Sequence, residues 1–190
     1  MKFQSLSVAA LLFSFAVTAN DPTGEPKFAH PVIKDHGGIV ELPDAAHQPK
    51  KNSKVLIDIT SDEKSGRVIK GLDRAALILN QYTHTDAGTD RGFKMAIILH
   101  GPATVAALSQ DGYAKHAKPY MKDKGQTENP NLELIAELRD AGVEILVCGQ
   151  ALAHHKFATT EVAPEVTIAV SAATVNIGLQ MENYAYIPFH

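Results

Sequence analysis

The chain has 190 residues, 45% of them hydrophobic, with 18 Lys and Arg against 21 Asp and Glu and a net charge of −3. This length indicates one domain, or one domain with a tail. Because the mildly acidic chain has no basic block, its composition argues against nucleic acid and anionic membranes as partners.

The first segment, residues 1–19, predicts export. Lys2 is the only charged residue before Asp21, and residues 9–19 are an apolar run that ends in small residues. The run is too short to span a bilayer stably, which favours a secretory signal peptide over an anchor or a first helix of the domain. Its removal leaves 17 Lys and Arg against 21 Asp and Glu, a net charge of −4. Since no later apolar stretch is long enough for a span, we expect a periplasmic protein that is free of the membrane.

Residues 20–53 are a polar segment without helix or strand periodicity, and they predict an extended arm or linker ahead of a domain at 54–190. The segment contains Gly37-Gly38 and the prolines Pro22, Pro26, Pro31, Pro43 and Pro49. It also contains His30, His36 and His47. These histidines permit a metal site, but scattered solvated side chains are the favoured interpretation.

From Lys54 onward, predicted strands alternate with predicted helices. Five short apolar segments predict strands: 55–59, 94–99, 143–147, 166–170 and 184–189. Apolar positions at helical spacing predict helices over 68–82, 129–141 and 171–179, and shorter helical segments over 104–109 and 151–157. The polar stretch 111–128 interrupts this alternation.

Local signals mark the helix ends. Pro102 is placed to open a short helix, Asn129 and Pro130 are expected as cap and first residue of the next, and Gly142 ends it. Ser171 is expected to cap the last helix. Nearly all-apolar strands separated by helices predict parallel strands covered on both faces. The expected fold class is therefore α/β, a three-layer α/β/α domain with a mostly parallel five-stranded sheet.

Sites in open parallel sheets gather at the carboxyl ends of the strands. That rule nominates four short segments: Thr60-Ser61-Asp62, His100-Gly101, Cys148-Gly149-Gln150 and Ser171. The stretch 111–128 follows the His100 strand and could fold over the same edge. It offers side chains for an anion site, although a solvated surface loop is the favoured interpretation: Tyr113, His116, Tyr120, Lys122 and Lys124.

Cys148 is the only cysteine, so an exported form of the chain cannot make an internal disulfide. The thiol is a buried small hydrophobe, a link to another chain, or a working group. In the last case it lies at the amino end of the helix that Gly149 and Gln150 begin. A histidine such as His100, His154 or His155 could approach it.

Common cofactor motifs are absent from the sequence. It has no G-x-G-x-x-G, G-x-x-x-x-G-K-[ST], H-E-x-x-H, C-x-x-C or G-x-S-x-G pattern. Adjacent histidines such as His154 and His155 point in different directions on a helix, and no third ligand stands four positions on. We therefore expect neither a cofactor nor a metal.

Several segments together resemble a known family. They are the segment 143–151 with its Cys148 and the helix before it, His100-Gly101-Pro102-Ala103, Asn129-Pro130-Asn131, and Gln180 with Tyr184-Ala185-Tyr186-Ile187. Over about residues 54–189 the chain is similar to the DsrE/DsrF-like family, which includes the DsrE/TusD sulfur-relay proteins. The resemblance implies a parallel five-stranded DsrEFH-like domain that forms homo- or hetero-oligomers. It also implies that Cys148 occupies the position that carries a persulfide in some relatives.

Two functions follow as hypotheses. The first is a periplasmic sulfur-handling protein in which Cys148 carries sulfur as a persulfide between a donor and an acceptor, with His100, Gly149, Gln150 and Lys122 as binding residues. The alternative is a non-catalytic small-ligand-binding or oligomeric assembly module of the same fold.

Overall fold

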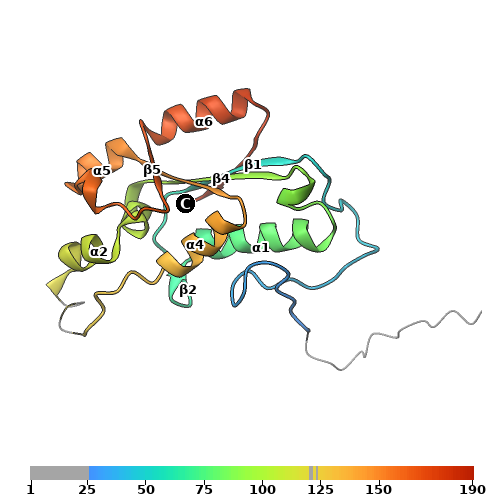
Figure 1. Ribbon diagram of the computed structural model, residues 1–190, viewed down its shortest axis with the longest axis horizontal. Helices are drawn as coiled ribbons and strands as arrows, with labels where there is room; N and C mark the ends of the chain where they lie inside the picture. Colours follow the sequence, from blue (N-terminus) through green and yellow to red (C-terminus); the bar gives the residue numbers. More distant parts are fainter. Residues whose placement is uncertain (1–25, 120–121, 123) are drawn as a thin grey trace, which may run out of the picture.

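The computed structural model describes residues 26–119, 122 and 124–190, so the predicted signal peptide lies outside the described residues. A parallel sheet forms the centre of the fold (Figure 1), with the strand order β6-β5-β4-β1-β7. Its strands are β1 (Lys54–Ile59), β4 (Lys94–Leu99), β5 (Glu144–Cys148), β6 (Thr167–Ala169) and β7 (Ala185–Phe189). The predicted five-stranded parallel sheet is confirmed.

Helices cover both faces of the sheet, which makes the three expected layers (Figure 1). On one face lie α1 (Lys70–His84) and α4 (Leu132–Asp140), and on the other lies α6 (Ala172–Met181). The chain also forms α2 (Gln110–His116), α5 (Gly149–His155) and a small hairpin of β2 (Lys64–Ser65) and β3 (Val68–Ile69). Among the described residues, no helix has the length and apolar character needed to cross a membrane.

The two faces of the sheet follow from the alternation of side chains along each strand. In β1, Val55, Ile57 and Ile59 point into the large core beneath α1 and α4. Leu56, between them, joins a much smaller cluster beneath α6, together with Ile98 of β4. The side chain of Asp58 also lies on the α6 side of the sheet, because its carboxylate accepts a hydrogen bond from Asn176 of that helix.

Two expected boundaries were wrong. The helix predicted to begin at Asn129 begins at Leu132, because Asn129 donates its side-chain amide to Ala106 O and Leu108 O instead of capping a helix. Part of the stretch expected as a polar loop is helical, since α2 starts at Gln110. Its cap is the hydroxyl of Ser109, which accepts a hydrogen bond from a backbone N–H of the first turn at 3.2 Å.

The described part of the arm packs against α1. Ile33 is fully buried in the core under that helix. Asn80 of α1 binds the arm with both halves of its amide: its Oδ1 accepts from two backbone N–H groups, and its Nδ2 donates to three carbonyls between positions 33 and 37. Gly37 approaches so closely that a Cβ there would lie 2.1 Å from the backbone nitrogen of Leu77. This arm is therefore part of the folded domain surface.

Candidate functional site

A buried carboxylate at the carboxyl end of β1 is the centre of a polar cluster. Asp58 is only 3% exposed, although it interrupts an otherwise apolar strand. Its Oδ1 lies 2.5 Å from Nε2 of His100, and its Oδ2 accepts from the side chains of Asn176, at 2.8 Å, and Tyr186, at 2.7 Å. A buried charge is tolerated when it is paired and hydrogen-bonded in this way.

The partners of Asp58 come from three different elements. His100 directly follows β4, Asn176 lies on α6, and Tyr186 lies on the edge strand β7. The hydrogen bond that the phenol donates to Asp58 raises the pKa of Tyr186 to about 12, and partial burial and the charge of Asp58 add to the rise. The Oδ1 atom of Asn176 is buried with no hydrogen-bond partner among the described residues. An acceptor for a further donor is therefore present beside the carboxylate.

Cys148 lies next to His100 across two paired strands. Leu99 is in register with Val147, and His100 and Cys148 are the residues that directly follow this last pair. Both have extended backbone, and alternation places both side chains on the α6 side of the sheet. Adjacent strands are about 4.8 Å apart. The thiol and the imidazole therefore emerge side by side at one end of the sheet.

The thiol itself is largely covered. Cys148 is 5% exposed and belongs to the small core beneath α6, together with Leu146 and Ala172. Its Sγ accepts a hydrogen bond from the backbone N–H of Ala151 at 3.4 Å. The small alanines of the cluster leave little bulk around the sulfur.

A family model for the DsrE/DsrF-like family matches residues 54–189. The chain belongs to this family. Two solved structures are similar to this DsrE/DsrF-like chain: a protein of unknown function, MTH1491 from Methanobacterium thermoautotrophicum, and the ychN protein from E. coli. The first has 17% identity and a TM-score of 0.45, the second 15% and 0.46, and each match covers 72% of this chain and 99% of the other. No curated protein matches the chain.

Gly149 and Gln150 lie where β5 turns into α5, beside the end of β6. A Cβ on Gly149 would come within 2.9 Å of Ala169 O, so glycine is required for the close approach of the two segments. The side-chain amide of Gln150 is exposed and donates to Val170 O at 3.4 Å. Both residues directly follow Cys148 in the first turn of α5, and their role in binding stays a prediction.

Lys122 is placed apart from Cys148, near α2. Its Nζ lies 3.5 Å from Lys115 O. In the same region Glu161 receives hydrogen bonds from Lys115 and His116 and from the backbone of Ala158, which lower its pKa to about 2. These contacts fasten α2 to the segment before β6. The structure thus brings four of the predicted site residues to one sheet edge, namely His100, Cys148, Gly149 and Gln150, and Lys122 is not among them. Tyr120 lies outside the described residues.

Within the described residues, no group of three or more His, Cys, Asp or Glu is arranged to hold a metal ion. His155 uses its ring to bond Gly101 O at 3.0 Å, which ties α5 to the turn after β4. His36 of the arm pairs with Asp73 of α1 at 3.6 Å. Two of the histidines that were considered as ligands from sequence therefore make structural contacts.

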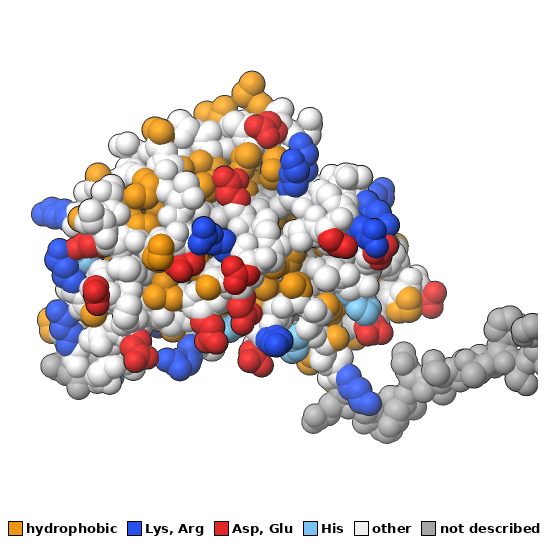
Figure 2. Space-filling view, viewed as in Figure 1, with side chains coloured by type: hydrophobic (Ala, Val, Ile, Leu, Met, Phe, Trp, Pro, Cys, Tyr) orange, Lys and Arg blue, Asp and Glu red, His pale blue; other side chains and the backbone are white. Residues whose placement is uncertain are grey.

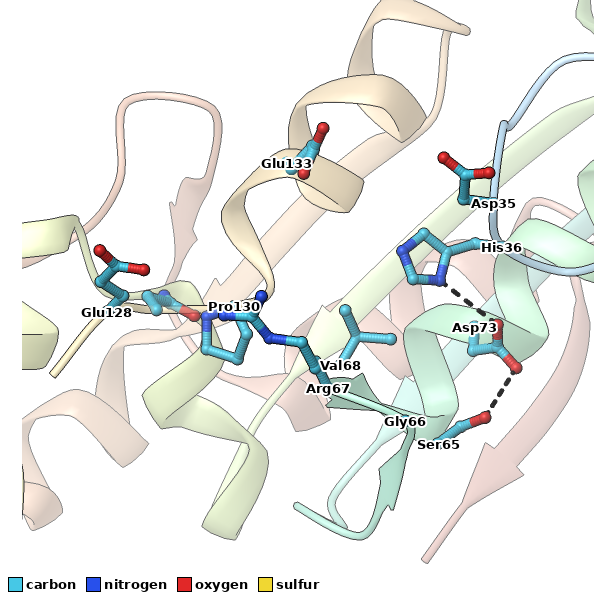
Figure 3. A pocket seen from close by; sticks show the side chains of 11 residues that line it. Asp35, His36, Ser65, Gly66, Arg67, Val68, Asp73, Glu128, Pro130 and Glu133 are labelled. Atoms are coloured by element: carbon cyan, nitrogen blue, oxygen red, sulfur yellow. Dashed lines mark hydrogen bonds and ion pairs between the residues drawn. The ribbon is translucent and has the colours of Figure 1, made fainter. Parts of the chain in front are cut away.

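A cavity of about 500 Å³ lies on the other side of the sheet (Figure 3). It is enclosed by the arm, the β2–β3 hairpin, α1 and the segment that leads into α4. Asp73 is held there by His36 and Ser65, and Arg67 extends toward Pro130. Because α1 and α4 separate it from the α6 side, this cavity is not part of the Cys148 site.

Three members of the polar cluster were not identified from sequence. Asp58 is visible there as the one charge between Val55 and Ile59, and that interruption of a buried strand is the signal that could have found it. Asn176 and Tyr186 carry no local signal, because they reach Asp58 from 118 and 128 positions away.

Proposed function

We propose that this DsrE/DsrF-like protein is an exported sulfur carrier that holds sulfane sulfur as a persulfide on Cys148. The observation that carries the proposal is the adjacency of Cys148 to His100, whose ring is fixed by the buried carboxylate of Asp58. Membership of a family that includes sulfur-relay proteins supports it. The periplasmic location rests on the composition of residues 1–19.

The chemistry needs only a thiolate and a donor. The sulfur of Cys148 attacks the sulfane sulfur of a small donor such as thiosulfate or a polysulfide, the donor's S–S bond breaks, and its electron pair leaves with the remnant. A new S–S bond on Cys148 replaces the broken one, so no external oxidant is required. An acceptor thiolate, free or on a partner protein, later removes the outer sulfur by the same kind of step.

The surroundings of the thiol favour a small donor. Cys148 is nearly covered in the single chain, and the cluster around it contains alanines at positions 151, 169 and 172. An inorganic anion needs less space than a protein-bound persulfide. Of the residues of α6, which lies over this cluster, only Ala172 is buried.

Intact mass spectrometry tests the proposal directly, because the chain has a single cysteine. After incubation with thiosulfate or polysulfide, the protein is expected to gain whole sulfur atoms that dithiothreitol removes. Cys148→Ser is expected to gain none, and an unfolded wild-type sample shows the full reactivity of a free thiol. Identical spectra for wild type and Cys148→Ser, or a thiol that reacts only after unfolding, would overturn the proposal.

A second candidate function, an assembly or ligand-binding module, is favoured by the apolar surface around α6. Val170 is 73% exposed and Met181 80%, and Ile168 and Ile177 are exposed beside them. Figure 2 shows hydrophobic side chains along the upper edge of the molecule, where Figure 1 places α6. Exposed apolar patches of this kind mark interaction surfaces. We propose self-association of the chain through this face.

The molar mass of the eluting protein, measured by light scattering, together with sulfur loading, distinguishes the assembly module from the sulfur carrier. Met181→Asp and Ile177→Glu are expected to shift an oligomer toward monomer, since a buried charge opposes association. If the chain is an assembly or ligand-binding module, Cys148→Ser is expected to keep the oligomeric state and any ligand binding of the wild type. A sulfur carrier loses sulfur loading in the same variant. Unchanged mass for both charge variants would contradict association through α6.

A further inference from the structure

We propose that His100 is the general acid–base residue for Cys148 and that Asp58 is the positioning residue for His100, an inference that rests on the proposed sulfur chemistry. Cys148, His100 and Asp58 would then act as one unit. Cys148 supplies the nucleophile, His100 moves its proton, and the buried carboxylate fixes the ring. No sequence motif predicted this arrangement, because the carboxylate lies 42 positions before the imidazole.

The strand order places His100 between the other two residues. β4 has β1 on one side and β5 on the other. His100 continues β4 in extended conformation, with φ of −152°, so its side chain stays on the α6 side with Asp58 and Cys148. On one side Asp58, which is in register with Ile98 two residues before His100, reaches the ring diagonally, and on the other side Cys148 follows Val147, the partner of Leu99.

The contact with Asp58 selects one tautomer of the ring. An ionised carboxylate only accepts hydrogen bonds, so Nε2 of His100 must carry a hydrogen and donate it across the 2.5 Å contact. In the neutral ring Nδ1 then has a free lone pair. No partner for Nδ1 is recorded within the described ranges, which leaves this atom available to take the thiol proton.

Asp58 is itself held from two further sides. Asn176 of α6 and Tyr186 of β7 both donate to Oδ2, which leaves Oδ1 for the imidazole. Such a carboxylate has little freedom to rotate, and it stabilises the imidazolium that forms when the thiol ionises. Besides Tyr186, His155 of α5 is a titratable side chain at this end of the sheet, and its ring bonds Gly101 O.

The proton balance closes without another group. Nδ1 of His100 takes the hydrogen of the Cys148 thiol as the sulfur attacks the donor. The S–S bond of the donor breaks and a new S–S bond forms on Cys148. The departing sulfite or thiolate then receives the proton from the imidazolium. The unpaired Oδ1 of Asn176 offers an acceptor for a protonated leaving group at the same end of the sheet.

The test measures how fast Cys148 reacts, not whether it can. Rates of iodoacetamide alkylation and of thiosulfate loading are followed across pH for wild type, His100→Gln, Asp58→Asn and the control His155→Gln. General acid–base assistance is worth about 100-fold or more, so the first two variants are expected to lose about that factor near neutral pH. Their pH profiles are expected to show the ionisation of a thiol alone. Wild type and His155→Gln should share a second inflection at lower pH, from the imidazole.

Asp58→Asn adds a separate prediction. Its side-chain amide can donate to the imidazole, which favours the opposite tautomer and occupies Nδ1 with a hydrogen. The rate is then expected to fall even though the ring remains present. His100 is partly exposed, so His100→Gln decides the question if Asp58→Asn does not fold.

The outcomes separate this inference from the proposed function. If His100→Gln keeps the wild-type rate and both inflections while sulfur still loads onto Cys148, the acid–base role is wrong and the carrier proposal stands. If the native thiol reacts but gains no sulfur, the carrier proposal fails, and the alkylation profiles still decide whether His100 controls the thiol. A thiol that is inert until unfolding overturns both.

Discussion

The two faces of the sheet differ in almost every physical respect. Beneath α1 and α4 lies a large, closed core that extends from Ile33 of the arm to Val166. Beneath α6 lies a small cluster, a buried carboxylate with polar partners, and a helix that buries only Ala172 fully. The comparison indicates that the first face stabilises the fold, while the second gives up packing for polar chemistry and for an exposed apolar surface.

A matched pair of substitutions tests this division with the largest effect. Leu72→Ala removes a fully buried side chain of α1 and is expected to lower the free energy of unfolding by about 2–5 kcal/mol. Leu179→Ala on α6 removes a half-buried one and should cost about 1 kcal/mol or less. Urea denaturation measures both. Equal losses would contradict the contrast between the faces.

The contact between arm and domain gives the next largest effect. Asn80→Ala leaves backbone groups of residues 32–37 without their partners, and an expected loss of about 1–3 kcal/mol follows from leaving such groups buried. The arm should then be cut faster by protease while the sheet stays intact. Gln81→Ala on the same helix, a side chain with no hydrogen bond to the arm among the described residues, serves as the control. Unchanged proteolysis would show that the arm is held by Ile33 alone.

The smallest effect concerns the polar cluster and depends on pH. Tyr186→Phe removes one hydrogen bond to Asp58 from a partly exposed phenol and should cost about 1 kcal/mol near neutrality. The pKa of this phenol rises from 10.0 to about 12 on folding, so its contribution is complete below pH 10 and is lost as the pH rises from 10 to 12. Urea midpoints from pH 8 to 12 should converge for wild type and variant. Parallel curves would indicate that the contact adds nothing.

The sheet was predictable from sequence because its strands are short apolar runs bounded by polar residues, and local patterns of that kind determine strands and their alternation. The cap at Ser171 was predictable for the same reason and is confirmed by its bond to Thr174 N. The start of α4 was not, because Asn129 and Asn131 bind distant backbone in place of their own helix. At the start of α4, the tertiary contacts of these two asparagines outweigh the local capping signal.

The candidate site was predictable in part. The rule for strand ends nominated Cys148 and His100 independently, and the register pairs the residues directly before them, Val147 and Leu99. The contact between His100 and the carboxylate of Asp58 could not be predicted, because the sequence does not reveal the strand order that brings β1 beside β4. Lys122 was nominated from a polar stretch that follows the same strand, but its side chain contacts Lys115 of α2, its neighbour along the chain.

The pairing of β1 with β7 also affects the order in which the fold can be completed. These strands are adjacent in the sheet, yet nearly the whole domain is synthesised between them. A nascent chain therefore presents Asp58, then His100, then Cys148, before Tyr186 has left the ribosome. Contacts of such high contact order form late in folding. Asp58 thus receives its hydrogen bond from Tyr186 only when the last strand docks, so the polar cluster is completed only after chain synthesis.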